Sequence, residues 1–439
     1  MKRVWLYGLY GVSGLFLGVA LVTANTGTGW AQAQKNPPPP KPVADVVCVN
    51  CHKTVTPGIV EDYMLSKHRQ VMVGCATCHG NAHNSPSNVA KAKIPTPDTC
   101  AQCHPQRVDE FKKGKHALSW ASMKAMPTMH FQPMALTQGM KGCGGCHKIG
   151  LKSEAEIKQL KEEGQSYGLA SCDACHTRHS FSVKEARQPQ ACQTCHMGFD
   201  HPQWEMYSAS KHGVRYLLKQ NNTLPASTAA PTCQTCHMPK GDHAVGTAWG
   251  FLAVRLPLPE DEQWAKDQTT ILQGLGVLDP DGQPTERLEV VKAASVARLT
   301  QEEWQARRNQ MIDVCAQCHS RKFAVGELKK GDDMIRQADR LMAEGIRTVA
   351  GLYKDGVLKK PQHYSRPFPD LLAFHDATTE VEQVLFRMYL EHRMRAFQGT
   401  FHANPDYALW YGWSEMVQDL TRIKELASNM RRERGLPAE

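Results

Sequence analysis

The 439-residue sequence predicts a mainly α-helical fold. Apolar side chains alone do not supply the core of this fold. Its hydrophobic content of 41% is slightly below the value of about 45–50% that is usual for globular proteins. No stretch shows the apolar–polar alternation typical of strands, whereas apolar residues recur at helical spacing beyond residue 380. All 16 cysteines lie between Cys48 and Cys318, a layout unlike the scattered thiols of an ordinary cytosolic enzyme.

The first 33 residues have the three parts of a secretory signal peptide. Lys2 and Arg3 supply positive charge, residues 4–22 form an apolar run, and residues 31–33 (AQA) match a small-x-small cleavage site. The mature chain is therefore expected to be exported, and its predicted location is the periplasm. An uncleaved membrane anchor is the alternative, because the apolar run is nearly long enough to span a bilayer.

Beyond the signal peptide the sequence divides into three parts. Residues 34–46 include four consecutive prolines and are expected to form a stiff tether. Residues 47–325 hold every cysteine, and residues 326–439 hold none. The last part is expected to be helical, because two apolar runs in it follow a helical period. These runs are Val381, Val384, Leu385 and Met388, and Met416, Leu420, Ile423 and Met430.

Two further segments have a distinctive composition. Residues 254–285 are rich in Pro, Asp and Gly and predict a long surface connection. Residues 401–413 (FHANPDYALWYGW) are aromatic but contain Pro405 and Gly412, and they predict a packed turn.

The pattern C-x-x-C-H accounts for all 16 cysteines. Its eight copies, in chain order, are Cys48/Cys51/His52, Cys75/Cys78/His79, Cys100/Cys103/His104, Cys143/Cys146/His147, Cys172/Cys175/His176, Cys192/Cys195/His196, Cys233/Cys236/His237 and Cys315/Cys318/His319. This is the attachment pattern of c-type haem, in which two thiols bind the porphyrin and the adjacent imidazole binds the iron. Disulfides or zinc sites would not require a histidine after every second cysteine.

Eight covalent haems are therefore predicted to form much of the core. Residues 48–319 hold all eight motifs, so each haem has about 34 residues of chain around it. The formal net charge of +9 falls to +7 without the signal peptide and is offset by haem propionates. It is too small to indicate a nucleic-acid partner.

Twelve histidines remain after the eight proximal ones. An electron-transfer haem takes a second axial ligand, whereas a haem that binds substrate keeps that side open. The distal candidates are His68, His83, His116, His130, His179, His212 and His243. They would serve seven haems and leave His201 for chemistry. Four late histidines follow the last motif: His363, His375, His392 and His402. One of them could instead bind the eighth iron as its second axial ligand.

These motifs, in this order, resemble those of the octahaem hydroxylamine oxidoreductases (HAOs). The resemblance covers roughly residues 45–430. It rests on the motif order, on residues 172–181 (CDACHTRHSF), 192–205 (CQTCHMGFDHPQWE) and 210–213 (SKHG), and on the helical C-terminal region. The later motifs also resemble those of pentahaem nitrite reductases that form ammonia.

The resemblance implies a catalytic fourth haem with an open distal face, bound through Cys143, Cys146 and His147. It also implies an acid–histidine pair near this haem, matched here by Asp200 and His201. Such a pair would relay protons near neutral pH. His179, Asp242 and His243 are competing candidates for the same role.

The resemblance leaves the direction of the reaction open. Family members that oxidise hydroxylamine cross-link a tyrosine to the catalytic haem of a neighbouring subunit in a trimer, and Tyr407 and Tyr411 lie in the matching region. Oxidising members also use a pocket tyrosine between the seventh and eighth motifs, yet this chain has none between Tyr216 and Tyr353. That departure favours reduction of nitrite or hydroxylamine.

The leading hypothesis is thus a periplasmic redox enzyme that acts on a small inorganic nitrogen species at a five-coordinate fourth haem. We expect a homotrimer joined through the C-terminal region, and a c-type cytochrome or quinol-linked redox partner. The alternative is an electron-transfer cytochrome in which all eight irons are six-coordinate. Octahaem tetrathionate-type chemistry fits less well, because every motif ends in histidine.

Overall fold

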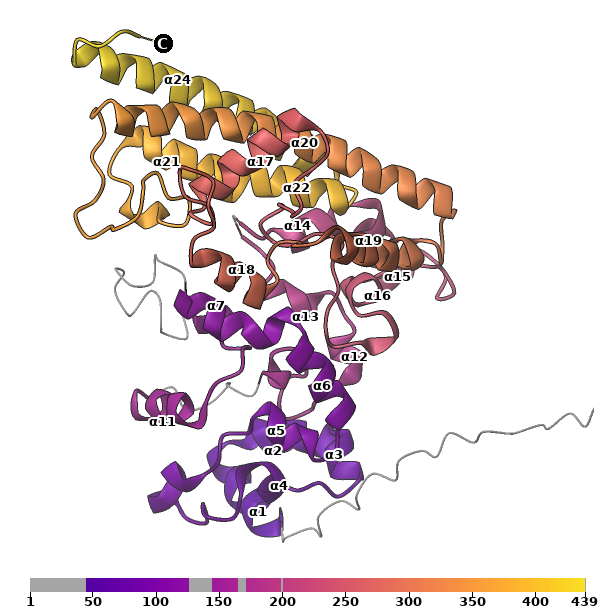
Figure 1. Ribbon diagram of the computed structural model, residues 1–439. Coiled ribbons are helices and arrows are strands. Elements are labelled where there is room, and N and C mark those ends of the chain that lie inside the picture. The colour runs from indigo at the N-terminus through magenta and orange to yellow at the C-terminus, as the bar shows by residue number, and fades with distance from the viewer. Residues whose placement is uncertain (1–44, 126–143, 165–170, 199, 439) are drawn as a thin grey trace, which may run out of the picture. The chain divides into compact units, whose positions relative to one another are not determined.

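The computed structural model describes residues 45–125, 144–164, 171–198 and 200–438 (Figure 1). All of these residues belong to one compact unit. The predicted signal peptide lies outside the described residues, as does the predicted tether up to residue 44. No helix in the described ranges combines the length and the apolar character needed to cross a membrane.

The predicted mainly α-helical class is confirmed. Within the described ranges, β pairing is limited to two isolated bridges, Arg255 with Arg298 and Leu278 with Pro284. The elements before residue 250 are α1 (Asp45–Val55), α2 (Pro57–Leu65), α3 (Lys67–Gln70), α4 (Cys75–His79), η1 (Pro86–Lys91), α5 (Pro97–Ala101), α6 (Pro105–Lys113), η2 (Lys115–Leu118), α7 (Ser119–Ala125), α10 (Gly144–His147), α11 (Glu154–Glu162), η3 (Cys172–Ala174), α12 (Val183–Ala186), α13 (Gln190–Gln193), α14 (Gln203–Ser208), α15 (Lys211–Gln220), α16 (Cys233–His237) and η4 (Pro239–Gly241). The later elements are α17 (Glu262–Gly274), α18 (Arg287–Ala294), α19 (Gln301–Cys315), α20 (Arg321–Lys354), η5 (Phe374–Asp376), α21 (Glu380–Arg387), η6 (Met388–Arg393), α22 (Met394–Phe401), α23 (Pro405–Ala408), η7 (Leu409–Ser414) and α24 (Glu415–Glu433).

Apolar packing is unevenly distributed along the chain. The largest cluster of buried apolar side chains draws all its members from residues 252–427. In the motif-bearing part, the buried members of one separate cluster are only Trp120, Met123 and Leu160. The short helices before residue 250 thus have little protein core of their own, as expected where prosthetic groups fill the interior.

Helix α20 is the central element of the C-terminal region (Figure 1). It packs against α17, α22 and α24. Ser320 caps its N-terminus by accepting a hydrogen bond from the backbone N–H of Phe323 at 3.2 Å. The boundary expected between residues 325 and 326 lies inside this unbroken helix, so the C-terminal helices continue directly from the last motif.

A buried ion pair joins α20 to η6, and a tryptophan of α17 donates a hydrogen bond to its carboxylate. Asp339 of α20 is fully buried and accepts hydrogen bonds from Arg393 Nε at 2.9 Å and Trp264 Nε1 at 2.8 Å. Arg393 also donates to the backbone oxygens of Leu252 and Ala253. Because both charges are paired and hydrogen-bonded, their burial is tolerated.

Residues 254–285 do not form a surface connection, so that prediction is wrong. They contain α17, whose Ile271 and Leu272 are buried in the largest apolar cluster. Asp261 caps the helix by accepting a hydrogen bond from the backbone N–H of Trp264 at 2.8 Å. The prolines and most of the glycines lie before or after this helix, so the average composition concealed it.

Residues 401–413 form a turn only in the short link 402–404 between α22 and α23. The rest of the segment is helical and consists of the end of α22, α23 and the π-helical turn η7. Gly412 is needed there, because a Cβ atom would lie 2.4 Å from the backbone N of Ala396. The neighbouring Trp410 and Tyr411 are 63% and 52% exposed, so these aromatic rings lie on the surface of the chain.

Candidate haem centres and active site

Each complete described motif forms roughly one helical turn. In four of them the backbone N–H of the histidine donates to the carbonyl of the first cysteine at 2.9–3.0 Å, in His104, His176, His196 and His319. Residues three and four apart lie on one face of a helical turn. The two thiols and the imidazole of a motif can therefore face one porphyrin.

The second cysteines of two motifs are exposed, Cys51 on α1 and Cys318 in the turn after α19. The other described second cysteines are half-buried, and two of them, Cys103 and Cys195, lie in turns beyond the ends of α5 and α13. In these two turns the backbone N–H of the second cysteine donates to the carbonyl of the first at 3.2 Å.

The chemical state of these thiols suits attachment. Cys51, Cys103, Cys195 and Cys318 take part in no disulfide. Haem attachment at each individual cysteine stays a prediction.

Thiols of different motifs lie close together. Cys100 of the third motif hydrogen-bonds with Cys172 of the fifth, and this contact together with burial raises the pKa of Cys100. Cys192 of the sixth motif hydrogen-bonds in the same way with Cys233 of the seventh, with the same effect on the pKa of Cys192. The same hydrogen bonds lower the pKa of Cys172 and of Cys233.

Similar contacts link further motifs. Burial and the thiols of the third motif raise the pKa of Cys78 to about 11. Burial and the thiols of the sixth motif raise the pKa of Cys175 to about 12, and burial and those of the eighth raise the pKa of Cys236 to about 11. Helix α1 of the first motif contacts α4 of the second. Except for the fourth motif, the motifs thus form an unbroken series of neighbours.

Seven of the eight proximal histidines face a second histidine across a nearly constant gap. The pairs and the distances between their ring centroids are His52–His83 at 6.0 Å, His79–His179 at 6.1 Å, His104–His68 at 6.3 Å, His176–His243 at 6.3 Å, His196–His116 at 6.0 Å, His237–His402 at 6.3 Å and His319–His212 at 6.2 Å.

This gap suits one iron between two imidazoles. An imidazole nitrogen lies about 2 Å from a first-row metal that it binds, and the ring centre lies about 1 Å behind that nitrogen. Two imidazoles on opposite sides of one iron therefore have centroids about 6 Å apart. The residues present thus fit haem by their donor chemistry and by their spacing.

Several of these rings are also oriented for metal binding. Nδ1 lies 2.7–3.0 Å from a backbone oxygen in His79, His147, His237, His243 and His402. When Nδ1–H donates to a carbonyl, the lone pair of Nε2 is available to a metal. Burial lowers the pKa of both His196 and His402 to about 4, so both rings are neutral at pH 7.

The described pairs include six of the seven distal candidates and one histidine outside that set. His402, 165 residues after its partner His237, takes a place for which an earlier histidine was expected. His130 lies outside the described residues. His402 lies beside Phe401 at the end of α22, but no local motif distinguishes it from the other late histidines.

The other late histidines lie elsewhere in the C-terminal region. His392 is buried, with Nδ1 2.5 Å from Asp419 Oδ2. His363 Nε2 lies 3.4 Å from Asp376 Oδ1, and His375 lies against Phe374.

His147 of the fourth motif is the exception among the proximal histidines. No described histidine faces it at the spacing found in the seven pairs. Its Nδ1 lies 3.0 Å from the backbone oxygen of Ser119 in α7, which fixes the ring. Cys143 of this motif lies outside the described residues, whereas Cys146 belongs to α10.

A carboxylate anchors the segment after the fourth motif. Glu156 of α11 accepts hydrogen bonds from Lys124 Nζ at 2.8 Å and Trp120 Nε1 at 3.0 Å, both in α7. Burial alone would raise the pKa of Glu156, but hydrogen bonds from Lys124, Ser153 and Trp120 lower it to about 2. The ionised carboxylate therefore ties α11 to α7.

The predicted acid–histidine pair is formed in the structure. Nδ1–H of His201 donates a hydrogen bond to Asp200 Oδ1. Burial would lower the pKa of His201, but the hydrogen bond and the charge of Asp200 outweigh it and raise this pKa. The ring centroids of His201 and His196 are 6.5 Å apart, and the two rings are nearly perpendicular to each other.

The competing candidates have other partners. His179 and His243 face the proximal histidines of the second and fifth motifs. Asp242 accepts a hydrogen bond from the backbone N–H of Ala244 at 2.9 Å, as in a local turn. These contacts favour the Asp200–His201 pair for proton transfer.

Tyr407 and Tyr411 form a pair of their own. Their ring centroids are 5.1 Å apart. Burial and then the charge of Glu205 raise the pKa of Tyr407. Tyr411 is the more exposed of the two.

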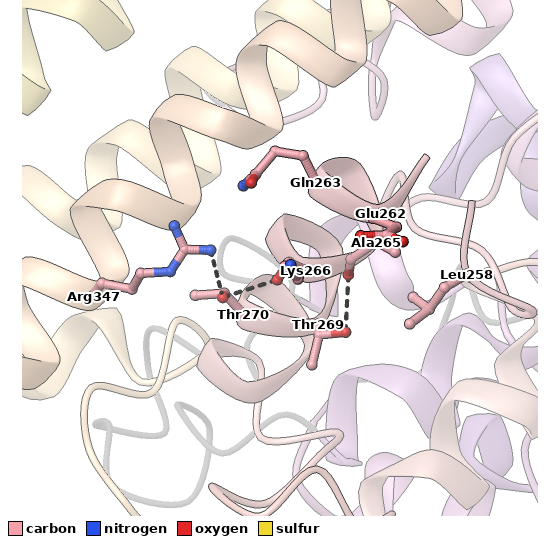
Figure 2. A pocket seen from close by; sticks show the side chains of 8 residues that line it. All are labelled: Leu258, Glu262, Gln263, Ala265, Lys266, Thr269, Thr270 and Arg347. Carbon is pink, nitrogen blue, oxygen red and sulfur yellow. Dashed lines mark hydrogen bonds between the residues drawn. The ribbon is translucent and has the colours of Figure 1, made fainter. Parts of the chain in front are cut away.

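A surface groove of about 770 Å³ lies along α17, away from the motifs (Figure 2). Arg347 Nη2 reaches across from α20 to Thr270 Oγ1 at 3.1 Å and also pairs with the buried Asp267. No motif cysteine or paired histidine lines this groove. It is therefore separate from the haem centres.

Two family models match the chain. The family described as "Seven times multi-haem cytochrome CxxCH" matches residues 71–252 and 287–367, which contain the second to eighth motifs. The family described as "Cytochrome c554 and c-prime" matches residues 22–80, which contain the first two. Because the first match covers more than half of the chain, the protein belongs to the multihaem cytochrome family and carries covalently bound haem c.

Comparisons with curated relatives and solved structures show which multihaem proteins this chain resembles. The chain is 26% identical over 88% of its length to a probable nitrite reductase–hydroxylamine oxidoreductase fusion protein of Kuenenia stuttgartiensis, of which it covers 51%. It is 24% identical over 36% of its length to the C-type polyheme cytochrome OmcB of Geobacter sulfurreducens, of which it covers 21%. The chain thus spans about half or less of the length of these curated relatives.

The fold resembles a chain of a reducing HAO-like protein complex of Kuenenia stuttgartiensis, with a TM-score of 0.66 and 25% identity over 89% of this chain and 86% of that one. A hypothetical multiheme protein shares the fold with a TM-score of 0.64 and 23% identity over 90% and 97%. The protein is a multihaem HAO-like cytochrome, and the resemblance inferred from its sequence is confirmed.

Proposed function

We propose that the protein is an octahaem redox enzyme that acts on a small nitrogen species at a five-coordinate fourth haem. Seven bis-histidine haems would relay electrons to or from this centre. The observation that carries the proposal is the set of seven histidine pairs at 6.0–6.3 Å, together with the absence of such a partner for His147 among the described residues.

The haem supplies the iron that binds the nitrogen species and exchanges electrons with it. The chain's own residues supply positioning and protons. His147 would hold the iron, with its ring oriented by the backbone oxygen of Ser119. His201, held by Asp200, would donate or accept protons, since reduction of hydroxylamine to ammonia and water takes up two protons with two electrons.

We favour reduction over oxidation. The absence of a tyrosine between Tyr216 and Tyr353 supports this direction, as does the likeness to a complex named as a reducing HAO-like protein. We further propose that the enzyme is periplasmic, forms a homotrimer through its C-terminal region, and exchanges electrons with a c-type cytochrome or a quinol-linked partner.

Electron transfer alone is the second candidate function. The unbroken series of neighbouring motifs supports it, because closely spaced redox centres form a conducting path. The partial match to a polyheme cytochrome agrees with it.

Turnover assays with hydroxylamine and nitrite distinguish these functions. With a reduced dye as electron donor, His201→Ala should lower turnover by about 10²-fold or more, the scale of a lost proton-transfer group. The control His375→Ala changes a histidine outside the seven pairs and should retain the wild-type rate. A wild-type protein without turnover in either direction would contradict the enzymatic proposal. A low-spin haem that turns high-spin in His201→Ala, with turnover intact, would make His201 an axial ligand.

A further inference from the structure

A chain of two amide side chains, Gln398 and Gln203, connects the acid–histidine pair to the sixth motif. Gln398 of α22 is 5% exposed. Its Nε2 donates to the backbone oxygen of Asp200 at 3.2 Å, and its Oε1 accepts from Gln203 Nε2 at 2.9 Å. Gln203 Oε1 in turn lies 3.2 Å from Nδ1 of His196, the proximal histidine of the sixth motif.

The backbone of the same residue contacts the seventh motif's pair. The carbonyl oxygen of Gln398 accepts from Nδ1 of His402 at 2.7 Å. His402 faces His237 at 6.3 Å. Gln398 therefore touches the distal ligand of one proposed haem, reaches the proximal ligand of another through Gln203, and holds the backbone of Asp200.

The direction of this chain is fixed. With Nε2 of His196 used to hold the haem iron, Nδ1 carries the hydrogen and donates, so Gln203 must accept with its oxygen and donate with its nitrogen. The Oε1 atom of Gln398 must then accept from Gln203, and only its Nε2–H group is left to donate to the backbone oxygen of Asp200. Each amide group in this series of hydrogen bonds therefore acts either as a donor or as an acceptor. An apolar or carboxylate side chain at residue 398 cannot supply both the acceptor for Gln203 and the donor to Asp200.

We propose that Gln398 is a positioning residue with two linked effects. It holds the backbone at Asp200, and so the proton-handling pair, and it fixes the hydrogen-bond acceptor of the sixth haem's proximal histidine. Hydrogen bonding at Nδ1 raises the basicity of a metal-bound imidazole, which tunes the potential of the iron. The effect on turnover rests on the proposed function, whereas the effect on the haem does not.

The test uses the haem-loaded full-length protein and two variants, Gln203→Met and Gln398→Met. Gln203→Met removes the acceptor of His196 directly. Both variants should move the electron paramagnetic resonance signal and the midpoint potential of the same low-spin haem. The shift should be larger in Gln203→Met and have the same sign in both, toward a higher potential. The control Gln383→Met changes an exposed glutamine of α21 and should change neither.

In an active enzyme, Gln398→Met should also lower kcat by about tenfold with KM nearly unchanged, while the number of bound haems stays at the wild-type value. A wild-type signal and potential in Gln398→Met, with a full set of haems, would overturn the proposed link to the sixth haem. An unchanged kcat would overturn the positioning of Asp200. A wild-type protein without turnover would contradict the proposed function but leave the spectroscopic test intact.

Discussion

Replacing His402 with alanine should open a second haem to external ligands. The structure pairs His402 with His237 at 6.3 Å, and no third imidazole among the described residues faces His237 at that spacing. If the seventh haem is held between these two rings, the variant leaves its iron five-coordinate. The number of haems that bind carbon monoxide should rise from one to two per chain.

The substitution also has a structural cost. The lost hydrogen bond to the backbone oxygen of Gln398 is worth about 1 kcal/mol. Large-to-small substitutions at buried sites cost about 2–5 kcal/mol through the lost contacts and the resulting cavity. The variant should therefore still fold, but at a lower melting temperature.

Titration of the reduced protein with carbon monoxide, normalised to haem content, measures this change. The control is His375→Ala, a late histidine that faces Phe374. It should bind one carbon monoxide per chain, as the wild type does. If His402→Ala also bound only one, its role as an axial ligand would be refuted, and with it the reasoning from ring spacing.

Three further predictions concern export, assembly and pH. Deletion of residues 2–33 should give a chain without haem, since the haem-attachment machinery works outside the cytoplasmic membrane; haem staining of a denaturing gel tests this, and a fully loaded cytoplasmic product would contradict it. Denaturing electrophoresis should separate the subunits, whereas a covalent trimer band that disappears in Tyr407→Phe or Tyr411→Phe would show an oxidising enzyme. Because the pKa of Glu156 is lowered to about 2, its ionised form should stabilise the docking of α11 above about pH 4.5, and this stabilisation should be lost as the pH falls toward 2. At pH 7, Glu156→Gln should cost about 1–2 kcal/mol, seen as faster hydrogen exchange in α11, and equal exchange in variant and wild type would contradict this.

The motif chemistry could be predicted from the sequence because it is local. In C-x-x-C-H, the spacing alone brings two thiols and an imidazole to one face of a helical turn, whatever surrounds them. How deeply each thiol is enclosed is not local, and so the exposure of Cys51 could not be read from the motif. The mainly helical class followed from local periodicity, as with Val381, Val384 and Leu385 in the buried face of α21.

Long-range pairing could not be predicted from the sequence. The contact between His237 and His402 depends on how α22 packs against α20, and nothing near either histidine encodes it. The amide chain through Gln398 joins residues almost 200 positions apart. Helix α17 was missed for a different reason: the prolines and glycines around it dominated the average composition, while its own residues are helix-compatible.

The most direct test of the central claim is the electron paramagnetic resonance spectrum of the oxidised wild-type protein, with spins counted against total haem iron. Seven bis-histidine haems and one open fourth haem predict that high-spin iron makes up one-eighth of the total and responds to added hydroxylamine or nitrite. A spectrum that is wholly low-spin and unchanged by these compounds would contradict the account.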